Sequence, residues 1–254
     1  MSQVNQNVQL LRYTPAPEET VSMAARLCYS SSTIDEIAQG VQKKDQAKYL
    51  ERLIEMGHLS CIEHASFTFG IEGVSRSLLA QLTRHRLASF SVQSQRYVGK
   101  VSHDGETFDY IIPPSIQALG DAAVKRFQDQ MSQMQEWYNQ WVDALGGEGE
   151  HSFEDARFVL PNAAGTRIIM TMNARELHHF FSMRCCNRAQ WEIRAMAWTM
   201  LEQVNRAAPH LFVGVGPGCL RGSCPEGKKS CGQAEAIRMR YQEMLKRIEA
   251  DIHA

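Results

Sequence analysis

Three arginines, one histidine and three serines lie within the fourteen residues from Arg84 to Tyr97, with no acidic residue among them. Clustered cations repel one another, so a folded protein keeps such a stretch either on a solvated surface or beside a bound anion. Arginine suits the second case because its planar guanidinium can donate two parallel hydrogen bonds to a phosphate. The stretch therefore predicts either a basic helix end or a local site for a phosphorylated ligand.

The apolar pattern before this stretch favours the ligand site. Leu78, Leu79 and Leu82 fall on one side of an expected helix. If that helix continues to residue 86, Arg86 projects onto the same apolar side. A charge on a core-facing side needs a partner, because an unpaired buried ion is very costly.

A second group of cations is expected on another helix. Asn173 is a good N-cap with Glu176 three residues later, as in a capping box. On the helix that follows, Arg175 and His179 share a face, and Arg184 falls on the apolar face with no acid within reach along the sequence. An arginine that extends from the edge of the core into water is the alternative.

Composition limits the remaining possibilities. The 254 residues are 44% hydrophobic and 22% charged, with a formal net charge of -1, so any anion binding must be local. No apolar run reaches the roughly 20 residues needed to cross a bilayer, and the N-terminal residues lack the pattern of a signal peptide. We therefore expect a cytoplasmic protein that binds neither a membrane nor nucleic acid in general. Seven cysteines in a chain of this size do not indicate a disulfide scaffold.

Helices and strands are interspersed along the chain, which predicts one compact α+β domain. Helices are expected over residues 17–30, 44–57, 78–86, 116–145, 152–160, 173–184, 191–204 and 233–252, and strands over 65–72, 107–112 and 164–172. The helix over 116–145 would be roughly 45 Å long. It would either pack against a partner chain or wrap its own domain with a kink.

Two segments resemble metal sites only weakly. His58, Glu63 and His64 lie within seven residues, but a turn whose side chains bind backbone is the favoured reading. Cys219, Cys224 and Cys231 offer three thiolates, one short of a structural zinc site, with His210 as a distant fourth ligand. Their spacing matches no standard zinc knuckle, so we expect no metal and keep these cysteines as a weak possibility.

The basic stretch resembles a known signature. Arg84-His85-Arg86, seven variable residues and then Ser94, followed by Arg96-Tyr97, is similar to the signature of the flavin-dependent thymidylate synthases. The resemblance extends to the loop at His58, the run from Ala156 to Pro161, Asn173 to Arg175, Met183-Arg184, and Gln190 to Arg194. It covers most of residues 50–200.

The resemblance implies a fold and an assembly. We expect a thymidylate synthase-complementing-protein-like fold, in which long helices flank a central, mostly antiparallel sheet. A single domain would assemble as a homotetramer with active sites shared between subunits. Residues 1–210 would form the catalytic domain. Residues 211–254, a Cys/Gly/Pro loop and an amphipathic helix, would pack on the same domain.

The resemblance also implies a reaction. Such enzymes convert dUMP to dTMP by reductive methylation, with methylenetetrahydrofolate as carbon donor, NADPH as reductant and FAD as the mediator of hydride transfer. Carried over by position, the dUMP-binding residues are Gln81, Leu82, Thr83, Arg84, Val92, Gln93, Ser94, Gln95, Arg96, Arg157 and Arg184. The FAD-binding residues are His58, Ser60, Arg84, His85, Arg86, Val92, Asn173, Arg175 and His179.

Two of these residues resemble catalytic groups. Arg184 is similar to the residue thought to activate the uracil ring by stabilising negative charge on it, which suits a permanent cation. Ser94 resembles a serine once proposed as a nucleophile. Since no base partner is evident and reduced flavin can deliver hydride, we expect Ser94 to orient dUMP.

Some positions depart from the family, and other functions stay open. Cys61 stands where proline is common, Val92 where many relatives carry a polar side chain, and His179 where some have asparagine. A non-catalytic nucleotide- or RNA-binding module is the alternative function. The flavin-free thymidylate synthase needs a cysteine in a Pro-Cys-His context, which the chain lacks.

Overall fold

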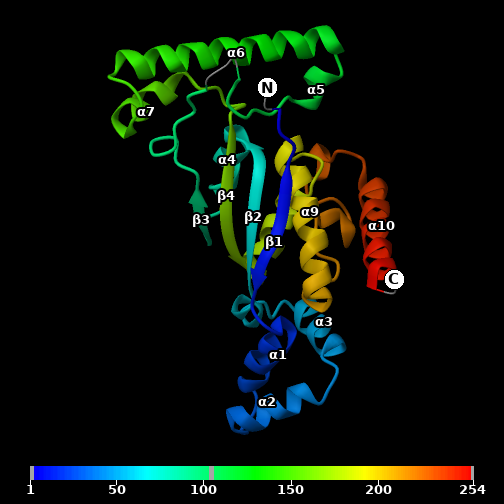
Figure 1. Ribbon diagram of the computed structural model, residues 1–254. Coiled ribbons are helices and arrows are strands. Elements are labelled where there is room, and N and C mark those ends of the chain that lie inside the picture. The colour runs from blue at the N-terminus through cyan, green and yellow to red at the C-terminus, as the bar shows by residue number, and fades with distance from the viewer. Residues whose placement is uncertain (1–2, 103–105, 253–254) are drawn as a thin grey trace. The chain divides into compact units, whose positions relative to one another are not determined.

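The computed structural model describes residues 3–102 and 106–252. It contains a four-stranded sheet in the order β1-β2-β4-β3 (Figure 1). The strands are β1 (Asn7–Tyr13), β2 (Ser66–Ser75), β3 (Ala88–Val92) and β4 (Gly165–Asn173). They run antiparallel. The N–H of Thr14, just after β1, donates to the carbonyl of Ser66, the first residue of β2. The expected mixed α+β class with an antiparallel sheet is confirmed.

Alternation of side chains makes β2 a half-buried strand. Phe67, Phe69 and Ile71 are at most 2% exposed, whereas the intervening Thr68 and Gly70 are only half-buried. Where β2 pairs with β4, the hydroxyls of Thr68 and Thr171 lie 2.9 Å apart. The strands expected over 65–72 and 164–172 are confirmed, and β2 extends three residues further.

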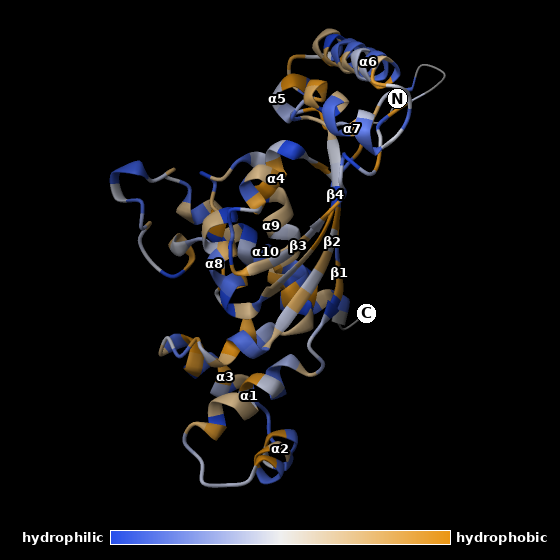
Figure 2. Ribbon diagram, turned by 90° about the vertical axis from the view of Figure 1, so that its left-hand side faces the viewer, coloured by the Kyte–Doolittle hydropathy of each residue, from blue (hydrophilic) through white to orange (hydrophobic). Residues whose placement is uncertain are grey.

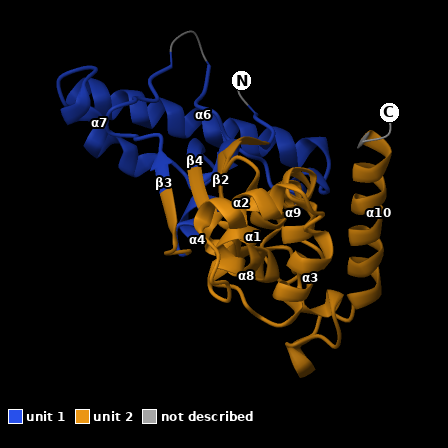
Figure 3. Cartoon of the chain, turned by 90° about the horizontal axis from the view of Figure 1, so that it is seen from below, with its two compact units in different colours: residues 1–7, 70–84, 90–169 blue, residues 8–69, 85–89, 170–254 orange. Residues whose placement is uncertain are grey.

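The chain divides into two compact units (Figure 3). Unit 1 comprises residues 1–7, 70–84 and 90–169, and unit 2 comprises residues 8–69, 85–89 and 170–254. Unit 1 contains α4 (Arg76–Leu82), α5 (Pro114–Gln117), α6 (Asp121–Ala144) and α7 (Glu150–Ala156). Unit 2 contains α1 (Pro17–Leu27), α2 (Ile34–Gln42), α3 (Ala47–Glu55), α8 (Ala174–Arg184), α9 (Trp191–Ala207) and α10 (Ala234–Ile252).

The long helix of unit 1 is shorter than expected. A helix over 116–145 is wrong, because Gly120 at φ 91° separates α5 from the 24-residue α6. That conformation is accessible to glycine and strained for other residues. The remaining helix is about 36 Å long at 1.5 Å per residue. Its buried stripe includes Met131, Tyr138 and Val142.

The strand expected over 107–112 is also wrong. Within the described residues, Tyr110 forms only isolated bridges, to Gln3 and Ala164. The backbone of this segment is satisfied differently: the N–H of Phe108 donates to Oε1 of Gln135 on α6 at 2.6 Å. Phe108 and Tyr110 nevertheless pack in a core cluster with Met131, so their apolar character reflects burial in a loop.

Unit 2 includes one helix that the sequence analysis missed. Thr33 and Glu36 form a reciprocal capping box at the start of α2, and that pair is the sequence signal that could have found it. The expected helix over 44–57 is α3, which ends before Gly57 at φ 76°. In the same unit, α10 packs beside α9 (Figure 1). Its apolar residues Ile237, Tyr241, Met244 and Ile248 are at most 6% exposed.

Apolar residues follow the strands of the sheet, whereas α6 carries both polar and apolar residues along its length (Figure 2). Among the residues that the structure describes, no helix combines the length and the hydropathy that a membrane span needs.

Candidate functional site

The Arg84-His85-Arg86 motif lies in a loop. Helix α4 ends at Leu82, so the expected helix over 78–86 is wrong in its last turn. Once the chain leaves helical geometry, the 3.6-residue period no longer predicts which way a side chain faces. Arg84 and Arg86 are exposed, and His85 is the buried member of the three at 4% exposure. The expectation that Arg86 faces the core is therefore wrong.

His85 connects two residues of α8 in unit 2. Its Nδ1 lies 3.2 Å from Oε1 of Glu176, and its Nε2 lies 3.0 Å from Nε of Arg184. Arginine can only donate, so Nε2 of His85 must be the acceptor and Nδ1 must carry the proton that is donated to Glu176. The hydrogen bonds thus run from Arg184 through a neutral imidazole to the Glu176 carboxylate.

Burial favours the same protonation state. Desolvation lowers the pKa of His85 below its usual value, and the charge of Arg184 lowers it further, while the hydrogen bond that His85 donates to Glu176 opposes both. The side chains of His85 and Glu176 are 3% and 8% exposed. We refer to Glu176, His85 and Arg184 as the Arg184 relay.

Helix α8 positions the relay. The Asn173 side chain accepts a hydrogen bond from the N–H of Glu176 at 2.9 Å, as the predicted N-cap requires. Two residues after the cap, Arg175 forms an ion pair with Glu63 of the segment Cys61–His64. That partner lies 112 residues away in sequence.

Arg175 and His179 line one cavity of about 390 Å³ in unit 2. The volume is within the usual range for ligand pockets. His178 also lines it and bonds to the carbonyl of Leu211 at 2.7 Å. Burial lowers the pKa of His178 to about 4, so this ring is neutral near pH 7. The other lining residues are Leu59, Ser182, Gly214, Val215, Gly216, Pro217, Gly218 and Arg221.

His58 and Ser60, the other FAD candidates of unit 2, are exposed in the loop after α3. The thiol of Cys61 donates to the carbonyl of His58 at 3.0 Å and so helps to close this turn. Within residues 3–102 and 106–252, no three His, Cys, Asp or Glu side chains are arranged to hold a metal ion. The free thiol of Cys219 is buried, and those of Cys224 and Cys231 are half-buried.

A second group of candidate residues gathers in unit 1. Arg96 pairs with Glu150 at 2.6 Å and with Glu154 at 2.8 Å, both on α7. Nε of Arg157 donates to the backbone carbonyl of Glu154 at 2.9 Å. Arg96 and Arg157 thus both contact Glu154, Arg96 at its carboxylate and Arg157 at its backbone carbonyl.

Arg76, which the sequence analysis did not select, lies in the same unit. Its guanidinium donates to the carbonyl of Gln93 at 3.2 Å. Burial lowers the pKa of Arg76, and the nearby charge of Arg157 adds to this effect. The sequence signal that could have found Arg76 is its position just before the apolar stripe that begins at Leu78, where it is the first residue of α4.

Ser94 shapes the turn that carries Arg96. Its Oγ accepts from the N–H of Arg96 at 3.1 Å and from that of Tyr97 at 3.4 Å. The neighbouring candidates Val92, Gln93 and Gln95 are half-buried. On α4, the side chain of Leu82 is fully buried, and the hydroxyl of Thr83 donates to the carbonyl of Leu79. Gln81 donates to the carbonyl of Ser77. Leu82 could therefore contact a ligand only through backbone atoms, whereas the exposed hydroxyl of Thr83 can still accept a hydrogen bond.

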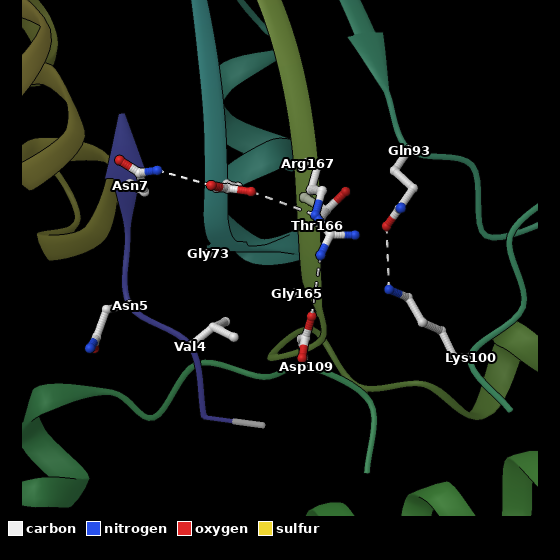
Figure 4. A pocket seen from close by; sticks show the side chains of 11 residues that line it. Val4, Asn5, Asn7, Gly73, Gln93, Lys100, Asp109, Gly165, Thr166 and Arg167 are labelled. Atoms are coloured by element: carbon white, nitrogen blue, oxygen red, sulfur yellow. Dashed lines mark hydrogen bonds and ion pairs between the residues drawn. The ribbon is translucent and has the colours of Figure 1, made fainter. Parts of the chain in front are cut away.

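Gln93 also borders a polar cavity of about 250 Å³ in unit 1 (Figure 4). Lys100 donates to Oε1 of Gln93 at 3.3 Å, and burial lowers the pKa of Lys100 against the opposing charge of Asp109. Arg167 lies 3.7 Å from Glu72 and 3.8 Å from Asp109. Neither Lys100 nor Arg167 was predicted from the sequence, because a single charged residue at a strand or loop position carries no recognisable pattern.

Comparison with known proteins identifies the family. Residues 9–210 match the family model described as thymidylate synthase complementing protein. A flavin-dependent thymidylate synthase from Geobacter sulfurreducens is 49% identical over 237 residues, covering 93% of this chain and 98% of the relative. Relatives with the same name from Clostridium tetani and Pyrococcus horikoshii are 47% and 39% identical, covering 92% and 94% of this chain and 96% and 98% of the relatives. The chain belongs to the flavin-dependent thymidylate synthase family and is an enzyme of that class.

Proposed function

We propose that the protein converts dUMP to dTMP by reductive methylation, with methylenetetrahydrofolate as carbon donor, NADPH as reductant and FAD as cofactor. The observation that carries this proposal is the Arg184 relay, which fixes the orientation of a permanent cation through two buried side chains. A cation with a fixed orientation is suited to stabilise charge that develops on a bound ring.

In this proposal, dUMP is bound by the residues carried over from the family resemblance. Arg96 and Arg157 bind its phosphate, helped by Arg84, because guanidinium groups match phosphate oxygens bidentately. Gln81, Leu82, Thr83, Val92, Gln93 and Gln95 shape the site around the nucleoside. Ser94 orients the substrate through the turn that it stabilises. Arg184 stabilises negative charge on the uracil ring and thereby activates it.

The residues proposed for FAD fit a phosphate-bearing dinucleotide. The cavity next to Arg175 and His179 is lined by basic and small residues, and its described lining includes no carboxylate. His58, Ser60, Arg84, His85, Arg86, Val92 and Asn173 are the further proposed contacts. FAD, when bound, supplies the hydride chemistry. The protein contributes binding, orientation and the fixed charge of Arg184.

We further propose that the enzyme is a homotetramer with active sites shared between subunits, and that residues 1–210 carry the catalytic function. The packing of α10 beside α9 supports the proposal that residues 211–254 belong to the same body as the catalytic residues. The exposure of Arg84 and Arg86 is consistent with sites completed by a partner subunit.

The function is tested by following NADPH oxidation in the presence of dUMP and methylenetetrahydrofolate. The purified protein should be yellow with flavin absorbance and should oxidise NADPH in step with dTMP formation. A colourless protein that cannot be reconstituted with FAD would exclude the flavoenzyme. It would leave the non-catalytic nucleotide- or RNA-binding module, which the basic residues alone could support.

A further inference from the structure

One wall of the cavity beside Arg175 and His179 comes from a segment outside the family-model match. That match ends at residue 210, whereas Gly214 to Gly218 and Arg221 line the cavity. All of these residues belong to unit 2, together with α8, which supplies Arg175 and His179. The segment was assigned no function from the sequence.

The backbone of this segment holds Arg221 in one orientation. Nε of Arg221 donates to the carbonyl of Gly214 at 2.8 Å, and Nη2 donates to the carbonyl of Val213 at 3.2 Å. These two bonds use two of the five N–H donors of a guanidinium. Gly214 adopts φ 63°, and a Cβ there would lie 3.2 Å from Nε of Arg221. Glycine therefore permits both the turn and the close approach of the arginine.

The charges around the cavity favour an anion. Arg175 is partly neutralised by its ion pair with Glu63. His178 is neutral near pH 7, since its pKa is about 4. Arg221 adds a permanent positive charge, and its two bonds in this segment go to backbone carbonyls. The guanidinium is thus held in place by neutral groups while its charge remains available to a ligand.

We propose that Arg221 and the Gly214–Gly218 turn bind the diphosphate of FAD, so that the segment after residue 210 completes the cofactor pocket. This inference rests on the proposed function, which assigns Arg175 and His179 to FAD. Small residues at the turn allow a phosphate to approach the backbone, and the oriented arginine supplies charge-assisted hydrogen bonds.

Arg221→Gln tests the proposal through flavin retention rather than turnover. The holoenzyme is dialysed against a series of free FAD concentrations, and bound flavin is measured by absorbance. Arg221→Gln should weaken FAD binding about tenfold or more, because a charge-assisted contact is lost. Arg221→Lys should recover part of the affinity. Arg188→Gln, which removes an exposed arginine that does not line the cavity, should bind FAD like the unaltered protein.

Riboflavin, which lacks phosphates, separates phosphate binding from a distorted loop. Its affinity should be the same for Arg221→Gln and the unaltered protein, and the dependence of FAD binding on salt should be less steep in the variant. Unchanged FAD binding, equal weakening of FAD and riboflavin, or an effect confined to the KM for NADPH would each overturn the proposal. Failure of the unaltered protein to bind any flavin would instead refute the proposed function.

Discussion

The neutral imidazole of His85 accepts a hydrogen bond from Arg184, the proposed catalytic cation. Glu176→Leu would leave the proton on Nδ1 of His85 buried without its present acceptor, whereas Glu176→Gln retains an acceptor oxygen. We expect Glu176→Leu to lower kcat about tenfold to hundredfold with flavin still bound, and Glu176→Gln to retain most of it. Such a loss corresponds to roughly 1.4 to 2.7 kcal/mol of transition-state stabilisation.

The pH profile of Glu176→Gln distinguishes the relay from simple packing. The Glu176 carboxylate raises the pKa of His85 against the larger, opposite effect of burial, and the nearby Arg184 and His179 both lower it. Removing the carboxylate charge should therefore lower that pKa further. Since protonated His85 cannot accept from Arg184, the acidic limb of the kcat profile should move to lower pH. An unshifted limb would argue against control of Arg184 by His85.

His178 should make folding stability depend on pH. Its pKa is lowered by burial from 6.5 to about 4, so the unfolded chain binds more protons than the folded one between these values. The free energy of unfolding therefore decreases as the pH falls from 6.5 toward 4. The loss between pH 7 and pH 5 should be about 2 kcal/mol. Urea unfolding at both pH values measures it, and His178→Phe should show a smaller difference.

The acidic partners of the basic residues could not be predicted from the sequence. The family resemblance selected His85, Arg96, Arg175 and Arg184, and the structure gives each of them a polar or acidic partner. It could not identify their acidic partners, because Glu176 lies 91 residues from His85 and Glu63 lies 112 residues from Arg175. Helical periodicity relates residues three or four apart, so contacts of this separation appear only in the folded chain.

At the scale of elements, two glycines with positive φ provide a matched pair. A Cβ at Gly73 of β2 would lie 1.9 Å from the carbonyl oxygen of Asn5, whereas a Cβ at Gly120 would meet nothing within 4 Å. Gly120→Ala should cost about 1 kcal/mol for backbone strain alone. Gly73→Ala should cost about 3 kcal/mol or more, since the backbone must also shift. Equal unfolding midpoints for the two variants would contradict the close approach at Gly73.

Elements with strong local signals were predictable, and those governed by distant contacts were not. Alternation predicted β2, and apolar stripes predicted α10 and most of α6. The strand prediction for residues 107–112 was wrong because the apolar residues of this segment pack against α6, and its Phe108 N–H bonds to the Gln135 side chain. The predicted end of the helix at residue 86 was wrong because the basic residues after Leu82 are compatible with a helix. Only the structure shows that α4 ends at Leu82.

At the scale of the whole molecule, α6 presents exposed aromatic residues. Trp137 and Trp141 are 45% and 53% exposed, although their helix also carries the buried Tyr138 and Val142. Large exposed apolar side chains often mark an interface. If α6 contributes to the proposed homotetramer, Trp137→Glu with Trp141→Glu should shift the protein toward smaller species in sedimentation velocity.

The control for this prediction uses the same helix. Gln130→Glu with Ser132→Glu introduces the same charge at exposed polar positions of α6 and should leave the assembly unchanged. A tetramer that resists the tryptophan substitutions would show that these residues lie outside the subunit contacts.

The most direct test of the account measures dTMP formed per bound flavin in one sample of the purified enzyme and in Arg184→Ala. With dUMP, methylenetetrahydrofolate and NADPH supplied, we expect the unaltered enzyme to turn over repeatedly. Arg184→Ala should keep its flavin and lose at least about a hundredfold in turnover, equivalent to roughly 2.7 kcal/mol. Retained turnover in Arg184→Ala, or no dTMP from the flavin-loaded unaltered enzyme, would contradict the account.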